Sequence, residues 1–353
     1  MYLSKKSNEE EIQSIFLKWY KKNKRDLPWR SLQSNKLPNP YYIFVSEYML
    51  QQTTVNTVKN RFDEFILRWP TLDLFSTISS TSILSFWSGL GYYSRATNLL
   101  KAAKFIKKNF KSQIPKNYED LINLPGIGDY TAKAILGIAY NKPVMPLDAN
   151  IERILARVYG INKPLINIKK ELKNKSNFFI SKNSSTKLIQ AFMDYGSIIC
   201  TPRKPNCQIC KIQSLCKSYK KNLQNIIPIK SKIDLPKRKK YSRAYIFYNE
   251  KNEILVRKRS SKGMLPSMLE VPNDDWVINK NNLVHDKIIN KVKNKILSKG
   301  SVEYSFSHFD LETEVFYISV KKNIYKDQKW LKIKNMDKVE LPTVMKKIVS
   351  IAI

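Results

Sequence analysis

The sequence is poor in the features that mark fibrous, disordered and membrane proteins. Its 353 residues include only 9 glycines and 16 prolines, in no fixed repeat, which excludes a collagen-like or disordered chain. No apolar run approaches the roughly 18 residues that a membrane-spanning helix needs. Residues 1–13 are polar and lack the apolar core of a secretory signal, so we expect a cytoplasmic bacterial protein.

Acidic residues are also scarce, with 29 Asp and Glu against 63 Lys and Arg, and the formal net charge is +34. Such an excess favours a polyanionic partner, for example a nucleic acid. Only 12 of the 63 basic residues are Arg, and the chain is rich in Lys, Asn and Ile, as AT-rich coding produces. The charge alone therefore does not identify the partner.

Cysteine is absent outside residues 200–216, which argues against a disulfide scaffold and for a metal site in a reducing compartment. The four cysteines follow the pattern Cys200-x6-Cys207-x2-Cys210-x5-Cys216. Four thiolates at this spacing can surround one centre, and both zinc and a [4Fe–4S] cluster accept four cysteine ligands. The same loop carries three basic residues, Arg203, Lys204 and Lys211.

The first two thirds of the chain have the periodicity of helices. Apolar residues at helical spacing predict a helix over 9–22 and a long helix over 41–68, and a helix–loop rhythm continues to about residue 219. Strand-like alternation is scarce in this part. We therefore expect an all-α domain over residues 1–222, which includes the cysteine loop.

The pattern changes after residue 222. We interpret residues 223–240 as a basic linker, because residues 228–243 hold seven basic residues, one acid and two prolines. An α+β domain is expected over 241–353. Its predicted elements are the strand pairs 243–248 with 253–257 and 302–307 with 312–320, and a basic helix over 286–297.

A glycine-containing turn is the second motif of the all-α part. It reads Leu124-Pro125-Gly126-Ile127-Gly128-Asp129-Tyr130-Thr131-Ala132, with a new helix predicted to begin near Asp129. Gly126 and Gly128 permit a tight hairpin with outward amides, and amides at a helix N-terminus bind phosphate without reading sequence. An ordinary helix–helix turn has the same pattern, so this stretch by itself leaves both interpretations open.

Two carboxylates form the third motif. Glu47 shares a helix face with Ile43 and Leu50, and this apolar environment should raise its pKa and keep a proton available near neutral pH. Asp148 directly precedes a predicted helix and fits an N-cap, a role compatible with catalysis. Taken alone, each carboxylate also fits a purely structural role. One protonated acid and one ionised carboxylate are the usual pair for cleaving a glycosidic bond.

These motifs together resemble the helix–hairpin–helix DNA glycosylases, and more closely the MutY-type adenine DNA glycosylases, over nearly the full length. The segments that carry the resemblance are Leu27-Pro28-Trp29, residues 46–53, Gly89-Leu90-Gly91-Tyr92-Tyr93, residues 124–132, Leu147-Asp148 and the cysteine loop. The resemblance implies an all-α glycosylase domain followed by a Nudix-like α+β domain, and a [4Fe–4S] cluster in preference to zinc. It also implies a monomeric enzyme that removes adenine mispaired with 8-oxoguanine or guanine from double-stranded DNA.

The resemblance further implies roles for the catalytic side chains. Glu47 would protonate the flipped adenine at N7 and later help to activate water. Asp148 would stabilise the oxocarbenium-like sugar or bond to it transiently. Tyr130 and Asn150 would support this site.

Substrate-binding roles are implied in the same way. Trp29 and Arg30 would line the adenine pocket. Gln51, with its neighbour Gln52, and Tyr92 would fill or wedge the base stack around 8-oxoguanine. The two hairpin glycines would hold the DNA backbone.

In the second domain the segment Phe306-Ser307-His308 lies between two predicted strands. On its residues alone it fits an ordinary hairpin end with a core Phe, although a Ser and a His can also hydrogen-bond a purine edge and a nearby phosphate. The resemblance implies that this loop reads 8-oxoguanine. Residues 263–272 depart from the family, because they lack its aromatic and double-glycine pattern.

Three other functions compete with this interpretation. An endonuclease III-type glycosylase and lyase shares the hairpin and the cysteine spacing but has a Lys at the position of Tyr130, and a phenol cannot form a Schiff base, so we expect a mainly monofunctional enzyme. A working Nudix hydrolase needs a cluster of glutamates, and none occurs between Glu270 and Glu303. A non-catalytic DNA-binding protein with a metal clip does not explain Glu47 together with Asp148.

Overall fold

The structure is a computed structural model, and it describes residues 7–32, 37–229, 237–260, 263–266, 268–289, 292, 295–320, 329–339 and 341–353. The chain divides into two compact units. The first, called here the helical unit, consists of residues 1–77 and 98–232. The second, the sheet unit, consists of residues 78–97 and 233–353.

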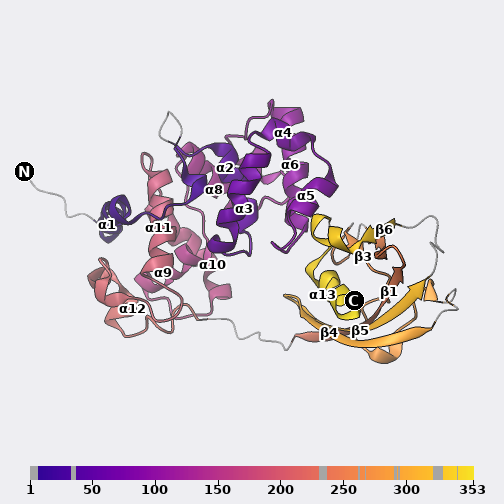
Figure 1. Ribbon diagram of the computed structural model, residues 1–353. Helices are drawn as coiled ribbons and strands as arrows, with labels where there is room; N and C mark the ends of the chain where they lie inside the picture. Colours follow the sequence, from indigo (N-terminus) through magenta and orange to yellow (C-terminus); the bar gives the residue numbers. More distant parts are fainter. Residues whose placement is uncertain are drawn as a thin grey trace, which may run out of the picture. The chain divides into compact units, whose positions relative to one another are not determined.

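The helical unit is built from α-helices and short 3-10 helices (Figure 1). These are α1 (Asn8–Asn23), η1 (Pro28–Arg30), α2 (Pro40–Leu50), α3 (Val55–Arg68), α4 (Leu72–Thr77), α7 (Tyr118–Ile122), α8 (Asp129–Tyr140), α9 (Ala149–Tyr159), α10 (Leu165–Ser176), η2 (Asn177–Phe179), α11 (Ser185–Ile198), η3 (Cys207–Ile209), η4 (Gln213–Leu215) and α12 (Lys217–Lys220). Two further helices are α5 (Ser80–Phe86), in the first segment of the sheet unit, and α6 (Ser94–Phe110), which begins there and continues into the helical unit.

The helix predicted over 9–22 is confirmed as α1. Its start is fixed by a capping box, in which the hydroxyl of Ser7 accepts from the backbone N–H of Glu10 (3.2 Å) and the carboxylate of Glu10 accepts from the backbone N–H of Ser7 (3.1 Å). Its apolar face, which includes Ile12 and Phe16, is buried.

The single long helix predicted over 41–68 is wrong, because α2 ends at Leu50 and α3 begins at Val55. Gln52 has a left-handed backbone with φ 56°, through which a right-handed helix cannot continue. The hydroxyl of Thr54 then accepts from the backbone N–H of Thr57 (3.4 Å) and caps α3. Apolar periodicity runs on through both helices and does not reveal the turn between them.

The central helix of the helical unit is α11, which packs against α1, α8 and α9. The ring of Phe16 stacks on Tyr195, with centroids 4.4 Å apart, and meets the edge of Phe192 at 4.5 Å. Gly137 lets α8 approach closely, since a Cβ added there would lie 2.2 Å from the Cδ1 atom of Ile189. Because neighbouring helices pack around α11, the polar side chains Thr186, Gln190 and Asp194 are buried as well.

The sheet unit contains a mixed sheet with α13 (Thr343–Ala352) packed on one face (Figure 1). Its strands are β1 (Arg238–Asn249), β2 (Glu253–Lys258), β3 (Leu269–Glu270), β4 (Ile296–Ser305), β5 (Phe309–Val320) and β6 (Lys329–Lys332). Their order is β3-β2-β1-β5-β4, and β6 pairs with β2. The β1 and β5 strands are parallel, and the other pairs are antiparallel. Two 3-10 helices, η5 (Lys280–Asn282) and η7 (Ile333–Lys338), lie in the connections.

Both predicted strand pairs are confirmed, as β1 with β2 and as β4 with β5. The predicted basic helix over 286–297 is wrong where the structure describes it, because 287 and 288 form a turn and Ile296 and Leu297 already belong to β4. The remaining residues of that stretch include 290, 291, 293 and 294, which lie outside the described ranges. Arg238, near the end of the predicted linker, is the first residue of β1, whereas 230–236 also lie outside those ranges.

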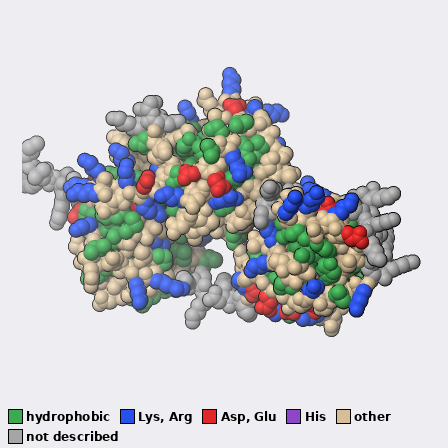
Figure 2. Space-filling model, viewed as in Figure 1, with side chains coloured by type: hydrophobic (Ala, Val, Ile, Leu, Met, Phe, Trp, Pro, Cys, Tyr) green, Lys and Arg blue, Asp and Glu red, His purple; other side chains and the backbone are tan. Residues whose placement is uncertain are grey.

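The visible surface carries Lys and Arg side chains in many small groups, with fewer Asp and Glu (Figure 2). Throughout the ranges given above, no helix combines the length and the apolar character that crossing a bilayer requires.

Substituting Gly126 tests the geometry of the hairpin. Its φ is +81°, and an added Cβ would lie 2.9 Å from the Cβ of Asn98 and 3.1 Å from a ring carbon of Tyr48. Left-handed backbone costs a non-glycine residue about 1–2 kcal/mol. Gly126→Ala is therefore expected to lower the free energy of unfolding by at least that amount, measured by urea unfolding followed through helical circular dichroism. Gly128→Ala is the control, since its Cβ would meet nothing within 4 Å, and an equal loss in both variants would contradict this account.

Candidate active site

A cavity of about 580 Å³ in the helical unit brings together most of the candidate residues. Those that line it are Trp29, Arg30, Glu47, Gln51, Gln52, Tyr130, Asp148 and Asn150. They come from η1, from the end of α2 and from the beginnings of α8 and α9. Segments more than one hundred residues apart in the sequence therefore meet in a space large enough for a nucleobase.

Glu47 lies on α2 and is only 6% exposed. Ile43 and Leu50, from the same helix, also line the cavity, as the sequence pattern predicted. Burial, helped by the charge of Asp148, raises the pKa of Glu47 to about 8, although the hydroxyl of Tyr130 donates a hydrogen bond that acts in the opposite direction. Glu47 is therefore protonated at neutral pH and loses its proton as the pH rises through about 8.

This raised pKa also sets the sign of the coupling to stability. The unfolded chain ionises Glu47 near its ordinary value of 4.5, whereas the folded chain keeps the proton up to about 8. Between these two values the unfolded state binds fewer protons, so the contribution of Glu47 to stability falls as the pH rises. The fold thus sacrifices some stability to hold a neutral acid in the cavity.

Asp148 caps α9, as predicted, and its carboxylate accepts from the backbone N–H of Ile151 (2.7 Å) and from the side-chain amide of Asn150 (2.7 Å). Burial raises the pKa of Asp148, while these hydrogen bonds and the charge of Arg153 act to lower it. Two N–H donors and a cation thus favour the ionised form of Asp148, whereas the carboxyl group of Glu47 accepts from the hydroxyl of Tyr130.

Arg153 was missed by the sequence analysis, and it holds the side chain of Asn150 in place. Its guanidinium donates to the Oδ1 of Asn150 (2.8 Å), to the carbonyl of Gly196 (2.7 Å) and to the carbonyl of Cys200 (2.7 Å). Gly196 allows this close packing, since a Cβ there would lie 2.6 Å from the Cβ of Asn150. One arginine therefore connects the carboxylate site to the cysteine loop.

A second missed residue is Gln190 on α11, which lines the cavity and is 4% exposed. Its amide nitrogen donates to the carbonyl of Thr186 (2.8 Å), but within the described residues its Oε1 atom has no hydrogen-bond partner. An unsatisfied acceptor costs free energy in an empty cavity and gains a bond when a ligand brings a donor. A polar residue on a buried helix face was the only sequence signal for it.

The glycine hairpin adjoins the end of α2. The hydroxyl of Tyr48 donates to the carbonyl of Pro125, and the amide of Gln51 donates to the carbonyl of Gly126 (3.3 Å). The helix predicted to begin near Asp129 is confirmed as α8, with Gly128 as its N-cap. The hairpin is thus fixed to the helix that carries Glu47.

Tyr92 and the Phe306-Ser307-His308 loop lie in the sheet unit. Gly89, Gly91 and Tyr92 all have positive φ, and the guanidinium of Arg95 donates to the carbonyls of Leu90 (2.9 Å) and Gly91 (3.0 Å). The turn leaves Tyr92 39% exposed.

In the Phe306-Ser307-His308 loop, the backbone N–H of Phe306 donates to the carbonyl of Phe309 (2.9 Å), which closes a tight turn with Ser307 and His308 at its centre. The rings of Phe306 and Phe309 stack with centroids 4.8 Å apart. The hydroxyl groups of Ser307 and Tyr92 hydrogen-bond to each other. The structure therefore brings these two candidate residues together.

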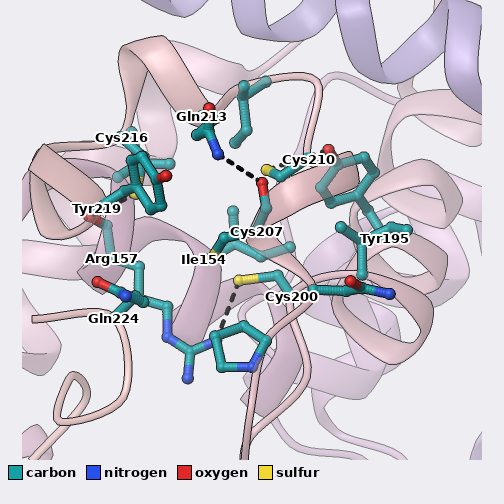
Figure 3. A pocket seen from close by; sticks show the side chains of 15 residues that line it. Ile154, Arg157, Tyr195, Cys200, Cys207, Cys210, Gln213, Cys216, Tyr219 and Gln224 are labelled. Atoms are coloured by element: carbon teal, nitrogen blue, oxygen red, sulfur yellow. Dashed lines mark hydrogen bonds between the residues drawn. The ribbon is translucent and has the colours of Figure 1, made fainter. Parts of the chain in front are cut away.

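The four cysteines line one pocket (Figure 3). The thiol sulfur of Cys200 accepts from Arg157 (3.2 Å), and that of Cys210 accepts from the hydroxyl of Tyr195 (3.3 Å). Among the described residues, no three His, Cys, Asp or Glu side chains converge on a position for a single metal ion. Four cysteines lining one pocket, with donors directed at two of the sulfurs, fit a centre with four cysteine ligands such as a [4Fe–4S] cluster.

Comparison with family models gives the class of protein. The HhH-GPD superfamily of base excision DNA repair proteins matches residues 45–178, which run from α2 to η2 and contain Glu47 and Asp148. The iron-sulfur binding domain of endonuclease III matches 200–216, and the NUDIX domain matches 243–350. The chain is thus a DNA glycosylase of base excision repair with an iron–sulfur cluster and a C-terminal Nudix domain. These matches confirm the predicted fold class and the predicted [4Fe–4S] type of cofactor over zinc.

Full-length relatives identify the family. The chain is 36% identical, over 95% of its length, to an adenine DNA glycosylase of Buchnera aphidicola subsp. Baizongia pistaciae, of which it covers 94%. It is 33% identical to that of the subspecies Schizaphis graminum, covering 97%, and 27% identical to that of Schizosaccharomyces pombe, covering 86%. The chain belongs to the adenine DNA glycosylase family, as its motifs predicted.

Solved structures agree with this assignment. A thermostable thymine-DNA glycosylase superposes with a TM-score of 0.55 at 27% identity, over 61% of this chain and 97% of that one. A non-covalent complex of endonuclease III with DNA gives a TM-score of 0.50 at 17% identity, over 62% of this chain and all of that one, and this likeness shows the shared helical fold. DNA is the partner of the chain because the family to which it belongs consists of DNA glycosylases.

Replacing Glu47 by Gln tests the role of its proton. The amide keeps the size of the side chain but cannot act as an acid, so Glu47→Gln is expected to lower the rate of base excision by about 10²–10⁴-fold while binding to mispaired DNA is retained. The measurement is single-turnover excision together with a DNA-binding isotherm. Glu64→Gln, on an exposed part of α3, is the matched control. A Glu47→Gln rate above about a tenth of that of the unmodified protein would be too small an effect for a general acid.

Proposed function

We propose that the protein removes adenine from A·8-oxoguanine and A·G mispairs in double-stranded DNA, acting as a monomer on the DNA of the bacterial cytoplasm. The observation that carries this proposal is the buried carboxyl group of Glu47, hydrogen-bonded to Tyr130 and next to Asp148, on the wall of a cavity of nucleobase size. The names of the relatives support adenine as the base.

The chemistry follows from the two carboxyl groups. A base inside a duplex cannot reach a cavity, so the adenine nucleotide is flipped out of the stack. Glu47 transfers its proton to N7 of adenine, the glycosidic bond breaks with its electron pair going to the base, and positive charge develops on the sugar. The carboxylate of Asp148 stabilises this charge. Ionised Glu47 then accepts a proton from the water that adds to C1′, which restores the acid.

The cavity walls supply contacts that suit adenine. The unpaired Oε1 atom of Gln190 accepts a hydrogen bond from the exocyclic amine, which guanine and thymine do not present at that position. Trp29 and Arg30 line the same cavity from η1. Gln51 and Gln52 lie at its rim in the turn after α2 and fill the space that the flipped nucleotide leaves in the stack.

Two further elements hold the DNA backbone. Backbone amides near Gly126 and Gly128, at the N-terminus of α8, bind phosphate. Cys200, Cys207, Cys210 and Cys216 would hold the [4Fe–4S] cluster, which supplies a rigid centre for its loop when bound. The loop residues Arg203, Lys204 and Lys211 then present positive charge to phosphates.

The base opposite adenine is read by the sheet unit. Adenine carries no damage signal, so the enzyme has to recognise 8-oxoguanine, which differs from guanine by a C8 carbonyl and an N7–H. Ser307 and His308 offer donors and acceptors at the tip of a tight turn, and Tyr92 is hydrogen-bonded to Ser307. The sheet unit has the Nudix fold but no Glu between Glu270 and Glu303, which supports base reading over nucleotide hydrolysis.

A single-turnover assay on synthetic duplexes tests the proposed function. We expect rapid release of adenine opposite 8-oxoguanine, slower release opposite guanine and none opposite thymine. Release of thymine or of an oxidised pyrimidine from the same duplexes, without release of adenine, would overturn the proposal and favour an endonuclease III-type specificity.

Changing both Ser307 and His308 to Ala tests the reader of the opposite base. Lost contacts to a base edge usually cost about 1–3 kcal/mol of discrimination. The double variant should therefore lose much of its preference for 8-oxoguanine over guanine, while removal of adenine from A·G slows less. The measurement is the ratio of the two excision rates. An unchanged ratio would place the reader elsewhere, at Gln51 and Tyr92.

Introducing an amine at position 130 tests the distinction between glycosylase and lyase. Tyr130 lies next to the two carboxyl groups, so Tyr130→Lys should add strand nicking, because an amine there can form a Schiff base with C1′. Trapping with borohydride detects this intermediate. The unmodified protein, with Lys133 one helical turn away, is the control and should not be trapped efficiently. Efficient trapping of it would mean that the enzyme is natively bifunctional.

A further inference from the structure

A completely buried carboxylate on α11, Asp194, lies outside the mechanism described above. Its side chain is 0% exposed, and its hydrogen-bond partners within the described residues, Arg25 and Arg30, belong to η1 and the loop before it. Its Oδ1 atom accepts from the Nε of Arg25 (2.6 Å) and the NH2 of Arg30 (2.9 Å). Its Oδ2 atom accepts from the NH1 of Arg30 (2.7 Å) and the backbone N–H of Arg25 (3.0 Å).

The hydrogen bonds between Asp194 and Arg30 have a defined geometry. The contact with Arg30 is bidentate, with two parallel N–H···O bonds that fix both the position and the plane of the guanidinium. Burial raises the pKa of Asp194, but the hydrogen bonds and charges of Arg30 and Arg25 outweigh burial, and the net pKa is lowered. Asp194 is therefore an anion at neutral pH, and its charge is balanced entirely by residues of the loop.

Asp194 joins two walls of the base cavity. The loop supplies Leu27, Trp29 and Arg30 to the cavity lining. The helix α11 supplies Gln190 and Met193. A loop keeps its position only through its contacts with other elements. Here Asp194 is hydrogen-bonded to Arg25 and Arg30, which lie 169 and 164 positions before it in the sequence.

Arg30 remains partly open to the cavity, with its side chain 11% exposed. Asp194 and the carbonyl of Arg25 (3.3 Å) are the partners of its NH1 and NH2 groups within the described residues. A guanidinium has five N–H donors, so donors remain for a ligand in the cavity. A flipped purine offers ring nitrogens as acceptors.

We propose that Asp194 is a positioning residue for base recognition: it holds the guanidinium of Arg30 against the cavity wall so that the remaining N–H groups donate to a ring nitrogen of the flipped adenine. The inference rests on the proposed function and adds a residue to it. Asp194 itself does not contact the base.

Asp194→Asn is the direct test. An amide of the same size puts an NH2 group where Asp194 now accepts from an arginine donor, so the bidentate contact with Arg30 is lost. Misplacing a contact group by about 1 Å can lower a rate by up to about 100-fold, so we expect single-turnover excision of adenine to slow by about 10- to 100-fold. Asp63→Asn, on the exposed side of α3, is the matched control and should match the unmodified protein.

A double-mutant cycle separates positioning from a merely structural role. If Asp194 acts through Arg30, Arg30→Met alone slows excision by a similar factor, and Asp194→Asn adds little in the Arg30→Met background. Duplexes with 1-deazaadenine or 3-deazaadenine give a second cycle, because one of them lacks the nitrogen that Arg30 contacts. Asp194→Asn should slow excision of that analogue far less than excision of adenine.

Should Asp194→Asn not fold, Arg30→Lys carries the test, because a lysine keeps the charge but lacks the fork. Arg30→Lys should slow excision of adenine by the factor expected for Asp194→Asn. It should slow excision of the deaza analogue far less. The inference is overturned if Asp194→Asn lowers the unfolding temperature but excises adenine at the unmodified rate at a permissive temperature, or if the two substitutions add independently. Failure of the unmodified protein to excise adenine would instead overturn the proposed function.

Discussion

The carboxyl group of Glu47 is buried between Tyr130 and Asp148, and the organisation of the helical unit follows from keeping it there. Removing a carboxyl group from water raises its pKa to about 8 and costs stability as the pH rises. The apolar face of α2, the close packing of α8 and the cap of α9 together exclude water from it. Burial also raises the pKa of the neighbouring Asp148, but N–H donors from Ile151 and Asn150 and the charge of Arg153 act to lower it, so the surroundings favour the anion more at Asp148 than at Glu47.

The second carboxylate connects the site to the rest of the unit. Asp148 is bonded to Asn150, Asn150 to Arg153, and Arg153 to the carbonyl of Cys200 at the start of the cysteine loop. One turn further along α9, Arg157 donates to the sulfur of Cys200. The same short helix therefore places the carboxylate and supports the iron–sulfur loop, and hydrogen bonds connect the two.

Local patterns were sufficient for part of this structure. The helix α1 (Asn8–Asn23), the hairpin before α8 and the cap at Asp148 each depend on residues within one turn of the chain, and all three were predicted. The break at Gln52 was missed because a left-handed residue leaves apolar periodicity intact. Ile296 and Leu297, the first residues of β4, fell within the predicted helix over 286–297, because the Lys-rich stretch before them suits either state. Gln190 and Asp194 were missed because their partners or their cavity lie far away in sequence, and a polar residue on a buried helix face does not by itself indicate what it binds.

The most direct test of the account is the titration of Glu47 itself. Infrared difference spectra between the unmodified protein and Glu47→Gln isolate the carbonyl stretch of its protonated carboxyl group. The account predicts that this band is present at neutral pH and disappears as the pH rises through about 8. Loss of the band near the ordinary glutamate value of about 4.5 would contradict it, because Glu47 would then have no proton to give to adenine.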